Sequence, residues 1–134
     1  MVHFYAVVYT AGIAALAALS GVHWLREIES SRGEVSEYLL GVSPNLCAAV
    51  AITFVLLSDW ADQQKLIEYR TASRWFLGVA AISGIGLLGW EIFQRTSDKL
   101  VFDSNDIRAT LLGIVLSGAV FHLVTPRTAE PPPS

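Results

Sequence analysis

Charged residues are scarce in this sequence and are missing altogether from four long stretches. Asp, Glu, Lys and Arg make up 16% of the 134 residues and hydrophobic residues 53%, whereas about 25% of an average soluble protein is charged. The uncharged stretches are Met1–Leu25, Tyr38–Ser58, Trp75–Trp90 and Ala109–Pro126. A soluble four-helix bundle would carry polar residues at helical period along its outer faces, but these stretches are apolar all round. The sequence therefore predicts a membrane protein.

The lengths of these stretches predict how many times the chain crosses the membrane. A helix needs about 20 mainly apolar residues to span a hydrocarbon core of about 30 Å. The first, second and fourth stretches are long enough, and the third is long enough if its helix continues to Gln94. We expect an all-α, up-down bundle of four transmembrane helices at about 3–25, 38–58, 75–94 and 107–124. Four tryptophans fall near these ends, where the ring prefers the headgroup layer: Trp24, Trp60, Trp75 and Trp90.

Residues 1–125 are expected to form a single domain, and the proline-rich tail 126–134 is expected to be disordered. The first stretch has no positively charged segment before it and is longer than the apolar part of a signal peptide, so we expect a retained helix. The single cysteine, Cys47, excludes a disulfide within the chain and is expected to be a packing residue. The net charge of -3 and the lack of a long basic patch argue against nucleic acid as a partner.

Alternating helices would place the connections on two sides of the membrane. We call side A the side of the N-terminus, of the connection between the second and third spans, and of the tail; side B is the other. The Lys and Arg residues expected on side A are Lys65, Arg70, Arg74 and Arg127, and those on side B are Arg26, Arg32, Arg95, Lys99 and Arg108. The positive-inside rule leaves the orientation open. Small residues at four-residue spacing, such as Ala109, Gly113 and Ser117, would let helices approach closely, in this bundle or in a homo-oligomer.

Several polar residues are expected to meet on side B, because the third span ends there and the fourth begins there. They are Glu91, Gln94, Asp103 and Asp106, joined by His23 and Arg26 from the first span and Asn45 from the second. His122 is about 24 Å from Asp106 along a helix and so belongs to side A. An ionisable residue inside a span is costly unless it is paired or functional. Glu91 either pairs with Arg95 one turn later or faces inward with Gln94 as part of a polar site.

The two aspartates before the fourth span have a structural explanation as well. A carboxylate there can accept from free backbone N–H groups and meets the positive end of the helix dipole. We expect Asp106 or Asn105 to be the cap and Asp103 to have a role beyond capping. The cations Arg95, Lys99 and Arg108 are interpreted as headgroup contacts, or as contacts to an anionic lipid or phosphate beside the fourth helix.

The sequence carries few motifs typical of a catalytic or metal-binding site. The sequence has no H-E-x-x-H, no G-x-S-x-G and no Cys close to a His. Carboxylates with one His would suit a hard divalent ion, but they lack a tight ligand spacing. We therefore expect no metal and no cofactor.

The stretch WEIFQRTSDKLVFDSNDIRATLLG, Trp90–Gly113, resembles the C-terminal signature of the VanZ-like family of small bacterial membrane proteins. That signature has an acidic residue and a Gln at the end of a span, then an Arg, an apolar-Asp pair, a second Asp, an Asn and a Gly. The matching positions are Glu91, Gln94, Phe102, Asp103, Asp106, Ile107 and Gly113. Three positions depart from it: Leu100 replaces the Arg, Thr110 the Asn and Ser117 a later Gly. If that Arg neutralises the acids in the family, either Lys99 or Arg95 substitutes for it here or the chemistry of the site differs.

The resemblance implies a multi-pass protein of the bacterial inner membrane, in a family named for a member linked to resistance to a lipid-anchored glycopeptide antibiotic. The first expectation is a non-catalytic protein whose acidic site holds a lipid headgroup, an anionic or lipid-linked envelope ligand, or a partner. The second is a membrane-embedded hydrolase or transferase acting on a lipid-linked substrate, with Glu91 or Asp103 as general base. The third is a structural or accessory subunit in which the acids only cap and pair.

Overall fold

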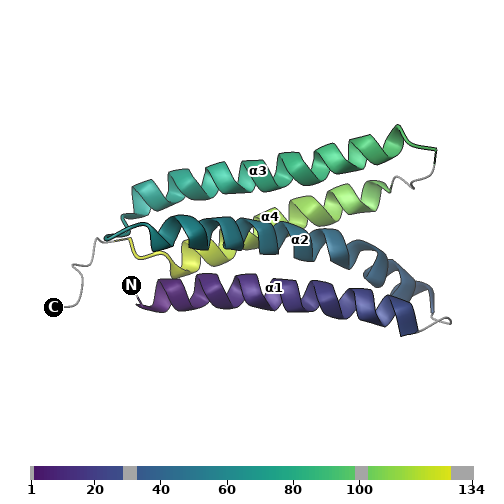
Figure 1. Cartoon of the computed structure of the whole chain (residues 1–134), viewed down its shortest axis with the longest axis horizontal. Helices are drawn as coiled ribbons and strands as arrows, with labels where there is room; N and C mark the ends of the chain where they lie inside the picture. Colours follow the sequence, from purple (N-terminus) through teal and green to yellow (C-terminus); the bar gives the residue numbers. More distant parts are fainter. Residues whose placement is uncertain (1, 29–32, 99–102, 128–134) are drawn as a thin grey trace.

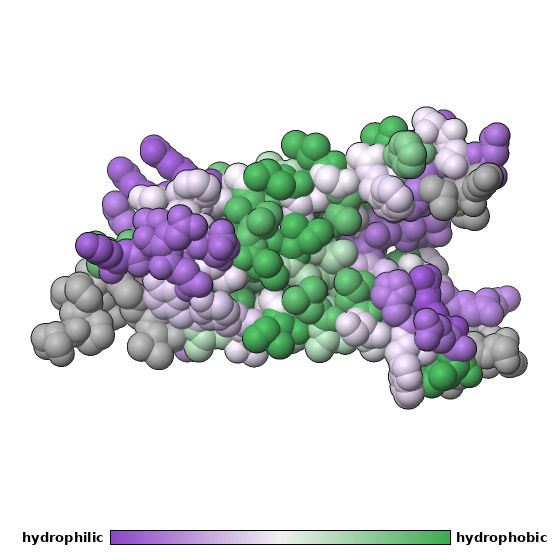
Figure 2. All heavy atoms as spheres, in the orientation of Figure 1, coloured by the Kyte–Doolittle hydropathy of each residue, from purple (hydrophilic) through white to green (hydrophobic). Residues whose placement is uncertain are grey.

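The computed structural model describes residues 2–28, 33–98 and 103–127, and it folds into four long helices. Their bounds are α1 Val2–Ile28, α2 Glu34–Asp62, α3 Tyr69–Arg95 and α4 Ser104–Val124. Consecutive helices run in opposite directions, so α1 begins and α4 ends at the same end of the bundle (Figure 1). All four are long and apolar enough to cross a membrane. Figure 2 shows hydrophobic side chains gathered around the middle of the bundle and hydrophilic ones at its two ends.

All four helices extend further than the sequence predicted, α2 and α3 by the most. The expected connection 59–74 shrinks to residues 63–68, because α2 continues to Asp62 and α3 begins at Tyr69. The added turns are buried: Trp60 is 6% exposed, and Ala61 and Ala72 are fully covered. Their packing against the core explains why the helices continue past the uncharged stretches.

The helix α2 is the centre of the bundle. It contacts the other three helices, whereas α1 and α3 make no contact with each other within the described part of the chain. Pro44 lies inside α2; it removes one backbone hydrogen bond and commonly kinks a helix. Figure 1 shows that the side-B end of α2 bends toward α1, while α3 runs away from it. The two helices therefore diverge on side B, and Asn45 directly follows the proline at this point.

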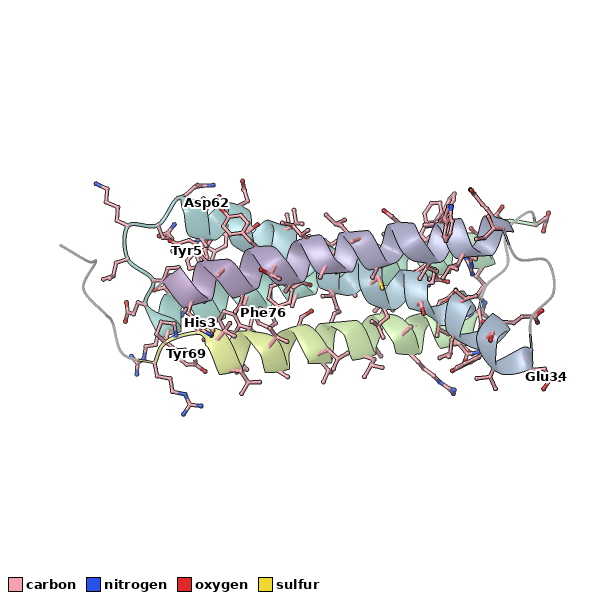
Figure 3. The ribbon with its side chains drawn as sticks, turned by 90° about the horizontal axis from the view of Figure 1, so that it is seen from below. His3, Tyr5, Glu34, Asp62, Tyr69 and Phe76 are labelled. Atoms are coloured by element: carbon pink, nitrogen blue, oxygen red, sulfur yellow. The ribbon has the colours of Figure 1, made fainter. Side chains whose placement is uncertain are left out.

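Toward side A the core is aromatic. Phe76 and Phe121 stack with ring centroids 4.5 Å apart, and Phe4 meets Phe121 edge-on at 6.5 Å. Leu57 and Phe121 are fully covered. Figure 3 places His3, Tyr5, Asp62 and Tyr69 at this end and Glu34 at the other. These large side chains close the interior of the bundle on side A.

In the middle and toward side B the core uses small residues instead. Ala49 of α2 accepts a hydrogen bond at its carbonyl from the Ser83 hydroxyl of α3, at 3.3 Å. A Cβ added to Gly113 of α4 would lie 2.8 Å from the carbonyl oxygen of Leu46 and 2.8 Å from the Cβ of Ala49. Glycine is therefore what allows α2 and α4 to pack backbone to backbone.

Candidate functional site

Glu91 is buried in the bundle although it carries an ionisable side chain. It lies on the inward face of α3, 1% exposed, one turn before that helix ends at Arg95. One turn corresponds to a rise of about 6 Å, so the carboxylate lies near the side-B surface but is covered by protein. A buried carboxylate is costly unless it is paired or hydrogen-bonded, and its partners therefore decide its role.

Only half of the Glu91 carboxylate has a partner. The Asn45 side-chain amide of α2 donates from Nδ2 to Oε1 at 3.2 Å. The second oxygen, Oε2, is buried and has no hydrogen-bond partner within the described residues. A pairing with Arg95, one of the two roles expected for Glu91, therefore does not occupy Oε2. Glu91 presents a free acceptor at the point where α2 and α3 diverge.

Asp106 brings a second acid to the same place. It lies in the first turn of α4, half-buried, and its carboxylate interacts with the Asn45 side chain. The charges of Asp106 and Asp103 act on Glu91 and repel it, while Arg26 at the end of α1 attracts Asp106. Each helix thus contributes one polar side chain to a group that we call the acidic cluster: Arg26, Asn45, Glu91 and Asp106.

The roles of the two aspartates are the reverse of those that the sequence indicated. The helix α4 begins at Ser104, not at Ile107, so its N-cap is Asp103, whose side chain accepts from the backbone N–H of Asn105 at 2.9 Å. Asp106 is then inside the helix and turns toward Asn45 and Glu91. The expectation was wrong because the helix starts three residues earlier, which moves the cap position by the same amount.

Thr110, one turn beyond Asp106, was missed by the sequence analysis. It is fully covered, and its hydroxyl has no hydrogen-bond partner within the described residues. A buried Ser or Thr in a helix usually donates to the carbonyl four residues earlier, as Ser117 does to Gly113 at 2.8 Å. The i,i+4 spacing from Asp106 is the sequence signal that could have placed Thr110 on the same face.

The other residues predicted on side B have different positions. His23 is exposed on α1, and the α1 side chain that acts on Asp106 is Arg26. Gln94 is half-buried on the same face of α3 as Glu91, Arg108 is exposed on α4, and Lys99 lies outside the described residues. His122 lies on side A as expected and shares a hydrogen bond of 2.8 Å with the Tyr69 hydroxyl. The part of the chain that the structure describes has no group of three or more His, Cys, Asp or Glu side chains placed to hold a metal ion.

Comparison with the models of known protein families, with curated proteins and with solved structures gave no match. The function is therefore argued from the acidic cluster itself.

Proposed function

We propose that the chain is a non-catalytic, VanZ-like multi-pass protein of the bacterial inner membrane whose acidic cluster binds the hydrogen-bond-donating headgroup of a lipid or of a lipid-linked envelope ligand. The observation that carries this proposal is Oε2 of Glu91, a buried acceptor that has no hydrogen-bond donor among the described residues. Leaving a buried polar group unpaired costs about 1–3 kcal/mol, and more when the group is charged. A donor supplied by a ligand would remove this cost.

The charges of the cluster favour a cationic donor. Glu91 and Asp106 repel each other, and Arg26 is the one cation that acts on Asp106 among the described residues. An ionised carboxylate only accepts hydrogen bonds, so a phosphate or a second carboxylate would find no donor at Oε2 and would be repelled. A primary ammonium group carries three N–H donors and a positive charge, and it matches both requirements. The unpartnered hydroxyl of Thr110 offers a further contact one turn deeper.

The packing around the cluster favours entry from side B. Toward side A the way is closed by the contact of Gly113 with Ala49 and then by the stacked rings of Phe76 and Phe121. On side B the bend of α2 and the end of α3 leave the two helices apart (Figure 1). Glu91 lies about one helical turn from the side-B end of α3, a depth that matches the layer in which headgroups lie.

The experiment compares two headgroups that differ in N–H donors. Detergent-purified wild type is melted with phosphatidylethanolamine or with phosphatidylcholine of the same acyl chains. The first has an ammonium with three donors and the second a trimethylated nitrogen with none. A ligand that binds only the folded state stabilises it by mass action, by about 2.7 kcal/mol at a hundredfold excess over its Kd. We expect phosphatidylethanolamine to raise the melting temperature above that seen with phosphatidylcholine.

Two variants complete this test. Glu91→Gln replaces the carboxylate with an uncharged amide that carries N–H donors. The difference in melting temperature between the two lipids should therefore disappear. Glu37→Gln removes an exposed acid on the same side and should keep the difference. If Glu91→Gln still prefers phosphatidylethanolamine, the acidic cluster is not the binding site. If neither lipid shifts the wild type, the acids have only the capping and pairing role of a structural subunit.

A further inference from the structure

A long groove follows the contact between α2 and α4 on a face other than that of the acidic cluster. Its side-B part has a volume of about 290 Å³ and lies between Leu39 and Val42 of α2 and Arg108 and Leu112 of α4. Its middle part, about 380 Å³, lies between Cys47 and Val50 of α2, Ala14 and Ala15 of α1, and Leu116 and Val120 of α4. Leu46 lines both parts, so they are successive sections of one groove.

The groove exists because three helices meet unevenly. The helix α4 packs closely on α2 through Gly113, and α1 packs along α2, but α1 and α4 hardly touch each other. The side chains of α1 at this level are alanines, which are too small to close the space. The groove is therefore open to the surroundings of the bundle along much of its length.

The chemistry of the groove changes along its length. The middle part is lined by apolar atoms, whereas the side-B part also has polar lining. There the exposed side chain of Arg108 lies with Asn105 and Tyr38. From Arg108 to Val120 the rise along α4 is about 18 Å, close to half of the ~30 Å hydrocarbon core. The groove thus has a cationic mouth at the membrane surface and an apolar bed that reaches the middle of the bilayer.

The size of the groove fits one lipid chain. If each methylene group takes roughly 30 Å³, the liquid volume of a water molecule, both parts together hold roughly twenty such groups. A helix of a second copy, about 10 Å across and 18 Å long, would occupy well over 1,000 Å³ and could only lie over the groove. The charge of Arg108, the length of the groove and its volume therefore all favour a lipid of the side-B leaflet as the occupant.

We propose that this groove binds one acidic phospholipid, with its phosphate at Arg108 and one acyl chain along Leu46 to Cys47 and Leu116. Arginine is suited to phosphate because its guanidinium donates two parallel hydrogen bonds. This site is separate from the acidic cluster, which has the opposite charge and lies on another face of α4, and it does not depend on the proposed function.

The headgroup is tested by native mass spectrometry of the detergent-purified full chain with equal amounts of phosphatidylglycerol and phosphatidylcholine of identical chains. We expect the wild type to retain phosphatidylglycerol roughly fivefold better, the factor that corresponds to the ~1 kcal/mol of one arginine at an anionic surface. Arg108→Gln should abolish the preference, and Arg108→Lys should keep most of it. Arg74→Gln, an exposed arginine on side A, should leave it unchanged, as should Glu91→Gln.

The position of the acyl chain is tested by a substitution that fills the groove. Ala14→Phe places a ring in the middle part at an exposed position, and we expect it to lower phosphatidylglycerol retention severalfold. Ala48→Phe makes the same change in another groove, which it lines with Leu16 and Ile52, and should not lower it. An undiminished preference in Arg108→Gln would overturn the phosphate site. Full retention by Ala14→Phe, or dimers that form independently of lipid and are lost with Ala14→Phe, would overturn the acyl-chain site.

Discussion

The amide of Asn45 donates to Oε1 of Glu91 across 3.2 Å and so joins α2 to α3 where the two helices separate. The same side chain also interacts with Asp106, so one neutral side chain lies between two acids from different helices. Asn45 therefore holds the acidic cluster together while leaving Oε2 of Glu91 free for a ligand.

Removing Asn45 alone should destabilise the protein more than removing both Asn45 and its partner Glu91. In Asn45→Leu the Glu91 carboxylate loses its donor, and an unpaired buried acceptor costs about 1–3 kcal/mol. In the double variant with Glu91→Leu no unpaired acceptor remains, and we expect most of the stability to return. Thermal or denaturant unfolding of the two single variants and the double variant would measure the coupling. Strictly additive losses would mean that the two side chains do not interact.

The two aspartates should respond differently to substitution. Asp103→Ala removes the N-cap of α4 and should destabilise the protein by about 1 kcal/mol, while Asp103→Asn keeps an acceptor and should cost much less. Asp106→Asn removes one of two mutually repelling charges and leaves the cap intact, so we expect little loss or a gain. Melting temperatures of the three variants would decide this. A larger loss for Asp106→Asn than for Asp103→Ala would contradict the cap position.

Gly113 should tolerate no side chain. In Gly113→Ala the new Cβ would lie 2.8 Å from the Leu46 carbonyl oxygen, a backbone atom that cannot move aside alone, so α2 and α4 must separate. Overpacking of this kind costs about 1–3 kcal/mol. The matched control is Gly86→Ala in α3, where nothing lies within 4 Å; there alanine should stabilise the helix by up to about 1 kcal/mol. Unfolding that ranked the two variants in the opposite order would argue against the close α2–α4 contact.

The up-down arrangement can be tested in the membrane itself. Cysteines introduced at Lys65, between α2 and α3, and at Asp98, after α3, would be labelled by an impermeant thiol reagent in intact cells. Both positions are exposed and lie at opposite ends of the bundle, so we expect only one of them to react before the cells are opened. A variant with Cys47→Ser removes the single native thiol. Labelling of both positions from the same side would contradict four crossings.

The sequence by itself determined the four helices and the end of the bundle at which the acids gather. Charge is costly in hydrocarbon, and only a helix satisfies its own backbone there, so the uncharged stretches predict the four helices, although each helix continues beyond its stretch. Once the helices alternate, Glu91 and Asp106 must share side B whatever the details of packing. This is why the helices and the presence of both acids at one end could be predicted without coordinates.

Only the tertiary structure decided which of these residues meet. A change of one residue in register turns a side chain by about 100° around a helix, and an earlier helix start moves the cap. For this reason Asp103 rather than Asp106 is the cap, and of the two α1 residues expected here, His23 and Arg26, it is Arg26 that acts on Asp106. The free Oε2 of Glu91 and the buried hydroxyl of Thr110 also depend on how α2, α3 and α4 are rotated against one another. That rotation is set by packing along the whole length of the helices, from Gly113, which lies against Leu46 beside Asn45, to Phe121 near side A.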